Sequence, residues 1–250
     1  MSLKEFYDHH KNFSARNLSE YDLSPGIRCK FDLLIKIIGN SRTFKNAIDL
    51  GCSGNSLLYI LENVQNKSYY DISALPLKQY SKQNPLCGDI VKLPYKNNTF
   101  DLVLALDVLE HVKNDDLAIS EIKRILTQGG FAVITVPHKM KYYSKQDKII
   151  GHYRRYEIEQ ILGLFQRYNF KYLKHFGVYG ILMKISLLQS INPKKTEKNL
   201  INLRNKYRSN LIFRKIWNLF VKLSSTLMKI DAKYYSPKRM MNMAFIFLKL

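Results

Sequence analysis

Three acidic residues and two glycines stand at the ends of short apolar runs in the first third of the chain. Asp49 closes the first run and is followed by Gly51 and Gly54, and Asp71 and Asp89 close the next two segments. Glycine lets the backbone after a strand approach a ligand closely. Asp71 lies 20 residues beyond Gly51, about the separation at which an acid reaches ribose hydroxyls in dinucleotide folds. The spacing therefore predicts a site for a nucleotide-sized ligand.

A dinucleotide fingerprint would require a third glycine in this loop, so the sequence argues against nicotinamide chemistry.

A second group of polar residues follows the nearly continuous apolar run at 100–106. Glu110 and His111 come directly after it, and His152 opens a segment that also contains two tyrosines and two arginines. Imidazole exchanges a proton near neutral pH, so His111 and His152 are the candidate catalytic residues. A histidine that merely caps a helix or fills a hydrogen bond is the alternative for His111.

Short strands and helices must position these side chains. Apolar residues at helical spacing predict helical structure from 3 to 38, with a break at 24–26. Beyond residue 44, short apolar runs alternate with amphipathic ones, which is typical of a parallel sheet covered by helices on both faces. The expected strands are 46–50, 68–71, 100–106, 131–136, 170–176 and 241–250, with a turn at 129–130; the expected helices are 56–64, 75–82, 115–126 and 156–168.

The order of the motifs resembles the class I S-adenosylmethionine-dependent methyltransferases over about residues 44–176. The shared motifs are Asp-x-Gly-Cys at 49–52, Gly-Asp at 88–89, Leu-Pro at 93–94, Phe-Asp at 100–101, Leu-Glu-His-Val at 109–112 and Gly-Gly at 129–130. The resemblance implies an α/β fold with a Rossmann-like, doubly wound seven-stranded sheet, mostly parallel with the last strand antiparallel. The expected units are an N-terminal helical cover (1–40), the cofactor-binding core (41–178), a basic helical insertion (179–238) and the final edge strand (239–250).

S-adenosylmethionine is the cofactor that this resemblance implies. Asp49 would orient the loop and the ammonium end of the cofactor, Asp71 would accept from the ribose hydroxyls, and Asp89 would accept from the adenine amine. Taken singly, each acid could instead cap a strand end. The predicted cofactor-binding residues are Asp49, Gly51, Cys52, Gly54, Asp71, Ile72, Asp89, Ile90 and Leu106.

The glycine loop departs from the family pattern at two positions. Ser53 and Asn55 stand where the family usually has glycine. Asn55 is an acceptable substitute because asparagine tolerates a left-handed φ. Ser53 could narrow the space under the cofactor, so a degenerate cofactor site is the alternative.

In-line methyl transfer needs positioning above all, and a general base only where the acceptor must lose a proton. The predicted acceptor-binding residues lie between the fifth strand and the next helix, and two arginines among them suit an anionic acceptor. These arginines could instead pair with Glu157 and Glu159. Asp107, Glu110 and His111 also resemble the cation-binding residues of ubiquinone-biosynthesis O-methyltransferases, but we expect no metal. The predicted acceptor-binding residues are His138, Tyr142, Tyr153, Arg154 and Arg155.

Composition and charge restrict the class of protein. The 250 residues are 46% hydrophobic and 24% charged, which is typical of a folded globular protein. The three cysteines lack metal-ligand spacing, and no apolar leader or membrane-spanning run is evident, so a cytoplasmic protein with free thiols is expected. The formal net charge is +20, and residues 181–240 hold 14 Lys and Arg against two acids. Such a field attracts phosphates on nucleic acid, anionic lipid or substrate, unless codon bias alone explains the lysines.

Residues 211–230 have a specific pattern within this basic segment. Polar residues recur every three or four positions and leave a broad apolar face. A basic stripe opposite tryptophan, phenylalanine and leucine is typical of a helix that lies on an anionic membrane surface. A helix that packs on its own domain as a lid, or on a second subunit, is the alternative. Nucleic acid is the weaker partner because no recognisable RNA-binding module accompanies the charge.

The sequence as a whole predicts an S-adenosylmethionine-dependent methyltransferase that acts on a small-molecule, lipid or saccharide acceptor. Its expected place is the cytoplasm, with peripheral contact to the inner membrane face. The alternatives are an RNA methyltransferase and a non-catalytic scaffold with a degenerate cofactor site.

Overall fold

A seven-stranded sheet forms the centre of the computed structural model, which describes residues 3–9, 16–39, 42–180, 182, 192–236 and 239–250. Its strand order is β3-β2-β1-β4-β5-β7-β6. The strands β1 to β5 pair with one another in parallel, and β7 runs antiparallel to both β5 and β6. The predicted fold class is confirmed. The strands are β1 (Phe44–Leu50), β2 (Val64–Asp71), β3 (Leu86–Cys87), β4 (Phe100–Leu106), β5 (Leu126–Pro137), β6 (Phe170–Tyr179) and β7 (Asn242–Lys249).

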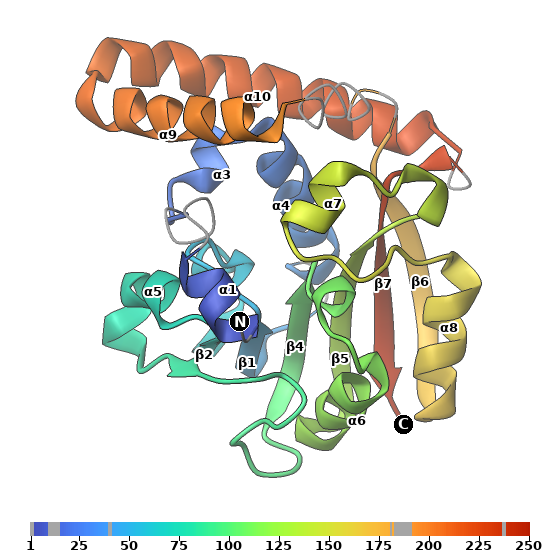
Figure 1. Ribbon diagram of the computed structural model, residues 1–250. Helices are drawn as coiled ribbons and strands as arrows, with labels where there is room; N and C mark the ends of the chain where they lie inside the picture. Colours follow the sequence, from blue (N-terminus) through green and yellow to red (C-terminus); the bar gives the residue numbers. More distant parts are fainter. Residues whose placement is uncertain (1–2, 10–15, 40–41, 181, 183–191, 237–238) are drawn as a thin grey trace.

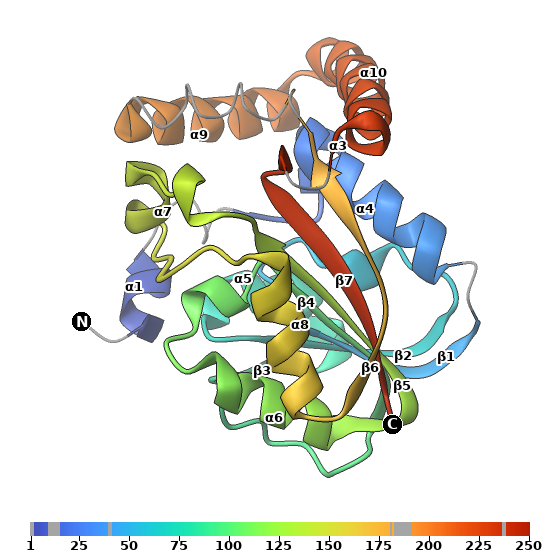
Figure 2. The same ribbon diagram turned by 90° about the vertical axis from the view of Figure 1, so that its right-hand side faces the viewer.

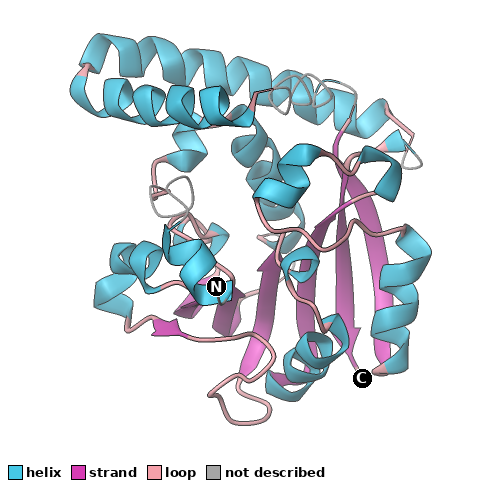
Figure 3. Ribbon diagram, viewed as in Figure 1, coloured by secondary structure: helices cyan, strands magenta, loops and turns pink. Residues whose placement is uncertain are grey.

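Helices cover both faces of the sheet (Figures 2 and 3). Successive strand residues point to opposite faces, so each strand contributes to two cores. In β4, Val103 and Ala105 pack with α6 and α8, whereas Leu102 and Leu104 pack with α4. The helices are α1 (Leu3–His9), α3 (Glu20–Leu23), α4 (Pro25–Ile38), α5 (Ala74–Leu77), α6 (Asp115–Ile125), α7 (Lys145–Ile149), α8 (Ile158–Arg167), α9 (Pro193–Ser209) and α10 (Leu211–Tyr234).

Two predicted helices near the sheet edge are wrong. Instead of a helix over 56–64, the chain makes a 3-10 turn at Leu57–Tyr59, and β2 already begins at Val64. The helix expected at 75–82 is broken into α5 and a 3-10 segment, with non-helical backbone at Tyr80. The break lets the Tyr80 ring stack on Tyr69 at 4.0 Å between centroids. The turn expected at 129–130 is not a turn between elements. Both glycines lie inside β5, at the point where the register of β5 against β4 shifts.

The basic segment between β6 and β7 contains the long helices α9 and α10, which contact each other and lie above the sheet in Figure 1. Helix α10 docks on the N-terminal helices through polar contacts. The Trp217 indole donates to the carbonyl of Leu23 at 3.0 Å, and Lys229 pairs with Asp32 at 2.5 Å. No described helix is long and apolar enough to cross a bilayer. The prediction that the last strand lies at the sheet edge is wrong, because β7 pairs with β5 on one side and with β6, the edge strand, on the other. The proposed unit boundaries at 40 and 238 lie outside the described residues, and the division into four units stays a prediction.

The buried ion pair between Glu20 and Arg204 is expected to hold α9 to the N-terminal helices. Arg204 Nε lies 2.7 Å from Glu20 Oε1, and both side chains are nearly inaccessible. Removing one partner of a buried pair leaves an uncompensated charge, so Glu20→Ala should lower the free energy of unfolding by about 3 kcal/mol, measured by urea denaturation. The exposed pair of Arg167 and Asp116 provides the control, and Asp116→Ala should change little. Equal losses in the two variants would contradict this role.

Candidate functional site

A cavity of about 420 Å³ opens at the carboxyl ends of β1, β2 and β4. The strand order reverses between β1 and β4, and open α/β sheets bind ligands at such a point. The volume lies in the range of small-molecule sites. Eight of the nine predicted cofactor-binding residues line this cavity: Asp49, Gly51, Cys52, Asp71, Ile72, Asp89, Ile90 and Leu106.

The loop after β1 forms the floor of the cavity. Gly51 has φ +71°, and a Cβ there would lie 2.5 Å from Val108 Cγ2, so the position requires glycine. Ser53 also adopts a left-handed φ of +48°, and its N–H donates to the Asp71 carboxylate at 2.9 Å. Asn55 does not have the left-handed φ that was expected of it, and the non-glycine residue of this loop with a left-handed φ is Ser53.

Gly54, the ninth predicted cofactor residue, does not line the cavity. A Cβ at this position would lie 2.1 Å from the backbone oxygen of Arg16. The glycine therefore lets the segment before α3 pass directly over the loop. This contact places Arg16 in the cavity wall.

The acids at the strand ends have different surroundings. Asp49 is buried and accepts from the Ser56 hydroxyl at 2.5 Å, and burial raises the pKa of its carboxyl to about 7. Asp71 accepts from the backbone N–H groups of Ser53 and Ser73, both at 2.9 Å. Asp89 is exposed at the cavity mouth. Asp49 thus holds the loop, while Asp71 and Asp89 present oxygen atoms to the cavity.

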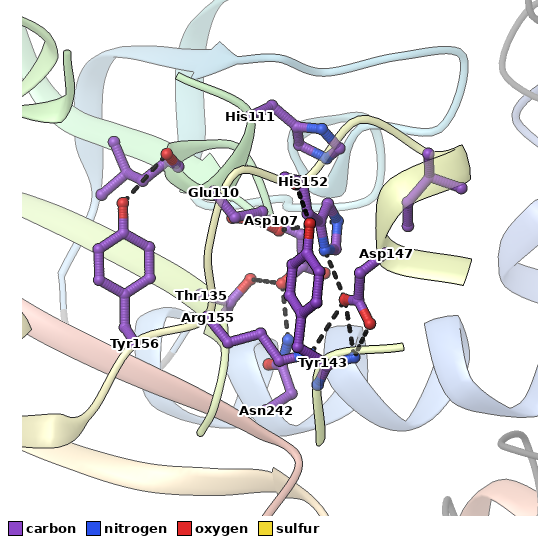
Figure 4. Close-up of polar contacts among 12 residues, drawn as sticks. Asp107, Glu110, His111, Thr135, Tyr143, Asp147, His152, Arg155, Tyr156 and Asn242 are labelled. Atoms are coloured by element: carbon purple, nitrogen blue, oxygen red, sulfur yellow. Dashed lines mark hydrogen bonds and ion pairs between the residues drawn. The ribbon is translucent and has the colours of Figure 1, made fainter. Parts of the chain in front are cut away.

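Glu110, His111 and His152 line another part of the cavity wall, where their side chains lie close together (Figure 4). One ligand atom from each lies within 4.8 Å of the others, so the three could in principle hold a metal ion. Glu110 is fully buried, and neither carboxyl oxygen has a hydrogen-bond partner among the described residues. Burial, and then the charge of Asp107, raise the pKa of Glu110 well above its usual range. This carboxyl group therefore favours its protonated form and has oxygen atoms that could bind a ligand.

His152 is oriented by a carboxylate behind it. Its Nδ1 lies 2.7 Å from Asp147 Oδ1, and its Nε2 lies 3.8 Å from Glu110 Oε1. Asp147 is fixed in turn by Arg155, whose Nε donates at 2.9 Å, and by the backbone N–H of Ser144. An Asp147 that accepts from Nδ1–H leaves Nε2 of His152 as a proton acceptor on the cavity side.

Helix α1 brings Tyr7 to the same part of the cavity wall. The Tyr7 hydroxyl is hydrogen-bonded to Nδ1 of His111, across 104 residues of sequence. Burial, followed by the neighbouring His152, lowers the pKa of His111 to about 3, so this imidazole is neutral at physiological pH. Both Tyr7 and Arg16 lie in a segment without a recognisable motif, and sequence reasoning did not identify either residue.

Asp107 does not join the cluster of Glu110, His111 and His152. Its carboxylate accepts from Lys30 Nζ at 2.6 Å, from Thr135 Oγ1 at 2.9 Å and from Asn242 Nδ2 at 2.8 Å. Burial opposes ionisation, but the charge and hydrogen bond of Lys30 outweigh it and lower the pKa of Asp107 to about 2. The suggested cation-binding set of Asp107, Glu110 and His111 is therefore not assembled.

The five predicted acceptor-binding residues lie outside the cavity lining. Arg154 pairs with Asp115 and Arg155 with Asp147, both at 2.8 Å, so the acids expected from the sequence, Glu157 and Glu159, are not their partners. Nδ1 of buried His138 donates to the carbonyl of Tyr156. Tyr142 ends a 3-10 turn, and Tyr153 is half exposed. Their part in binding an acceptor stays a prediction.

Comparison with known proteins identifies the domain. Residues 48–134 match the family model described as "Methyltransferase domain". An uncharacterized protein of Methanocaldococcus jannaschii is 41% identical over 111 residues, which are 44% of this chain and 48% of that protein. A demethylmenaquinone methyltransferase of Streptomyces avermitilis is 38% identical over 68 residues, 26% of this chain and 29% of that enzyme. The chain thus spans half or less of the length of these curated relatives.

Solved structures share the fold. Phosphoethanolamine N-methyltransferase 2 of Haemonchus contortus, in complex with S-adenosyl-L-methionine, matches with a TM-score of 0.64 and 19% identity over 100% of this chain and 60% of that one. A putative methyltransferase in complex with the Haloferax volcanii Trm112 activator matches with a TM-score of 0.62 and 11% identity over 99% and 97%. At these identities the likeness establishes the fold alone. Together with the family match, it shows that residues 48–134 correspond to a methyltransferase domain, on a fold that this chain shares with S-adenosylmethionine-dependent methyltransferases.

Proposed function

We propose that the protein transfers a methyl group from S-adenosylmethionine to a small-molecule, lipid or saccharide acceptor. The observation that carries this proposal is the single cavity that joins the acid-and-glycine loop to the cluster of Glu110, His111 and His152. A cofactor held by the acid-and-glycine loop would lie in the same cavity as the proton-accepting groups of the cluster. The complex of the Haemonchus enzyme with phosphomonomethylethanolamine and S-adenosylhomocysteine is a precedent for a small acceptor on this fold.

The residues around the acid-and-glycine loop fit the cofactor. S-adenosylmethionine supplies an electrophilic methyl on a positively charged sulfur. Asp71 and Asp89 would accept from its ribose hydroxyls and adenine amine, with Ile90 against the ring. The buried hydroxyl oxygen of Ser53 has no hydrogen-bond partner among the described residues and lines the same cavity, so it could bond to the ligand.

His152 is the general base in this proposal. Its Nε2 faces the cavity beside Glu110, and Asp147 holds the ring from behind. An acceptor hydroxyl or ammonium group that lies beside this pair, within hydrogen-bond distance of His152 Nε2, could give its proton to His152 and keep a hydrogen bond to the Glu110 carboxyl group. Neutral His111, anchored to Tyr7, would shape this part of the cavity.

The charge of the acceptor follows from which side chains reach the cavity. An anionic acceptor was expected from Arg154 and Arg155, but both are paired with carboxylates outside the cavity lining. Arg16 and Lys30 line the cavity, and Lys30 is paired with Asp107. Glu110 and the two histidines line the same cavity and could accept a hydrogen bond or a proton, so we favour a hydroxyl or amine as the accepting group. Methyl transfer to RNA in place of a small acceptor would support the alternative function.

Asp71→Asn should weaken binding of S-adenosylhomocysteine about 10- to 100-fold, because hydrogen bonds to a carboxylate contribute more than those to a neutral amide. Isothermal titration measures this loss. Asp116→Asn, which changes an exposed acid on α6, is the matched control and should bind like wild type. Failure of the wild-type protein to bind would favour the scaffold alternative, and equal binding by both variants would remove Asp71 from the site.

His152→Asn should lower kcat at least about 100-fold, the usual contribution of a positioned base, and leave S-adenosylhomocysteine affinity unchanged. His175→Asn, on the outer strand β6, should keep the wild-type rate. Initial rates on a panel of hydroxyl and amine acceptors provide the measurement. A wild-type kcat in His152→Asn would show that another group takes the proton.

Chelation should leave the activity unchanged. In-line methyl transfer needs positioning above all, and the proposed base is a histidine held by Asp147, so the proposed reaction needs no cation at this cluster. Assays after dialysis against EDTA, with and without added Mg²⁺, Mn²⁺ or Zn²⁺, test this. Activity that disappears on dialysis and returns with one ion would assign the cluster to a metal.

A further inference from the structure

Helix α10 carries a long apolar face that nothing in the described structure covers. Its large apolar side chains on this face are between 49% and 76% exposed. Most recur at intervals of three or four positions, so they form one stripe along the whole helix. The stripe consists of Ile212, Ile216, Leu219, Phe220, Leu223, Leu227, Ile230 and Tyr234.

The opposite face of α10 is the one that packs on the protein. Val221, Ser225 and Ala232 are buried there, Trp217 reaches the carbonyl of Leu23, and the helix lies against α4. The packing of α10 is therefore already satisfied without the stripe. A solvent-exposed apolar surface of this extent on a long helix is typical of an interaction site.

Exposed cations accompany the stripe. At about 100° per residue, Lys215, Lys222 and Lys233 line one of its edges, and all three are exposed. The adjacent helix α9 adds exposed lysines and an arginine. Glu197 and Asp231 are the acids between 192 and 236, and neither is among the exposed side chains. The exposed cations of α9 are Lys195, Lys198, Lys206 and Arg208.

We propose that α10 binds the surface of an anionic membrane, lying in the interface with its stripe in the acyl boundary. The lysines along the edge would reach lipid phosphates while their alkyl stems stay against the apolar layer. A second copy of the chain fits the surface less well. Pairing two stripes would bring the lysine edges and two chains of formal charge +20 together, which costs electrostatic energy.

The proposed contact would lie one helix away from the cavity. Helix α4, on which α10 packs, contributes Ile27, Lys30 and Phe31 to the cavity wall. A membrane-bound orientation therefore keeps the site close to the lipid surface. The membrane contact does not depend on methyl transfer, and its test needs no cofactor.

Vesicle flotation with the full chain tests the proposal. Wild type should float with vesicles of phosphatidylcholine mixed with phosphatidylglycerol and remain unbound with phosphatidylcholine alone. Ile216→Ser/Leu223→Ser/Leu227→Ser should reduce the bound fraction about tenfold or more, because the apolar contact is lost. Lys215→Glu/Lys222→Glu should also release the protein. Circular dichroism confirms that the variants, all changed at exposed positions, stay folded.

A matched triple variant elsewhere on the surface is the control. Leu86→Ser/Leu117→Ser/Leu173→Ser removes three side chains of 40% to 47% exposure outside α10 and should bind vesicles like wild type. Absence of wild-type binding to anionic vesicles, or unchanged binding of the α10 triple variant, would overturn the proposal. Sedimentation that shows a wild-type dimer and a monomeric α10 triple variant would assign the stripe to a second copy instead.

Discussion

The ion pair of Lys30 and Asp107 is the contact on which the arrangement of the site depends. Lys30 comes from α4 and Asp107 from the end of β4, and the same carboxylate accepts from Thr135 on β5 and Asn242 on β7. One partly buried charge thus ties a covering helix to three neighbouring strands. Asp107 also lines the cavity, but its carboxylate already accepts from three side chains, whereas the Glu110 oxygens have no hydrogen-bond partner among the described residues.

Helix α4, which this pair fixes to the sheet, links the cavity to α10. It contributes residues to the cavity wall and packs against α10. The two proposals made above, methyl transfer and membrane contact, therefore meet at one helix.

Residues whose positions follow from strand order could be predicted from the sequence. Asp49 and Asp71 end neighbouring parallel strands, so their proximity follows from the alternation of strands and helices alone. Tyr7 could not be found in this way, because it reaches His111 across 104 residues and from a short helix without a motif. The partners of Arg154 and Arg155 could not be predicted, since a guanidinium pairs with whichever carboxylate the fold brings near, and Asp115 and Asp147 come from separate helices. The pattern of 211–230 predicted the amphipathic helix, but which face would be buried depended on where α4 lies.

Gly54 shows that a glycine in a ligand-binding motif can be required for backbone packing rather than for contact with the ligand. The position touches Arg16 rather than the cavity, and Arg16 forms part of the cavity wall. Any side chain at 54 would push the Arg16 backbone outward and open the wall from behind. Such a variant would present in assays as a loss of cofactor affinity, although the changed atom never meets the cofactor. For this loop, the phenotype of a substitution and the location of the ligand are therefore separate questions.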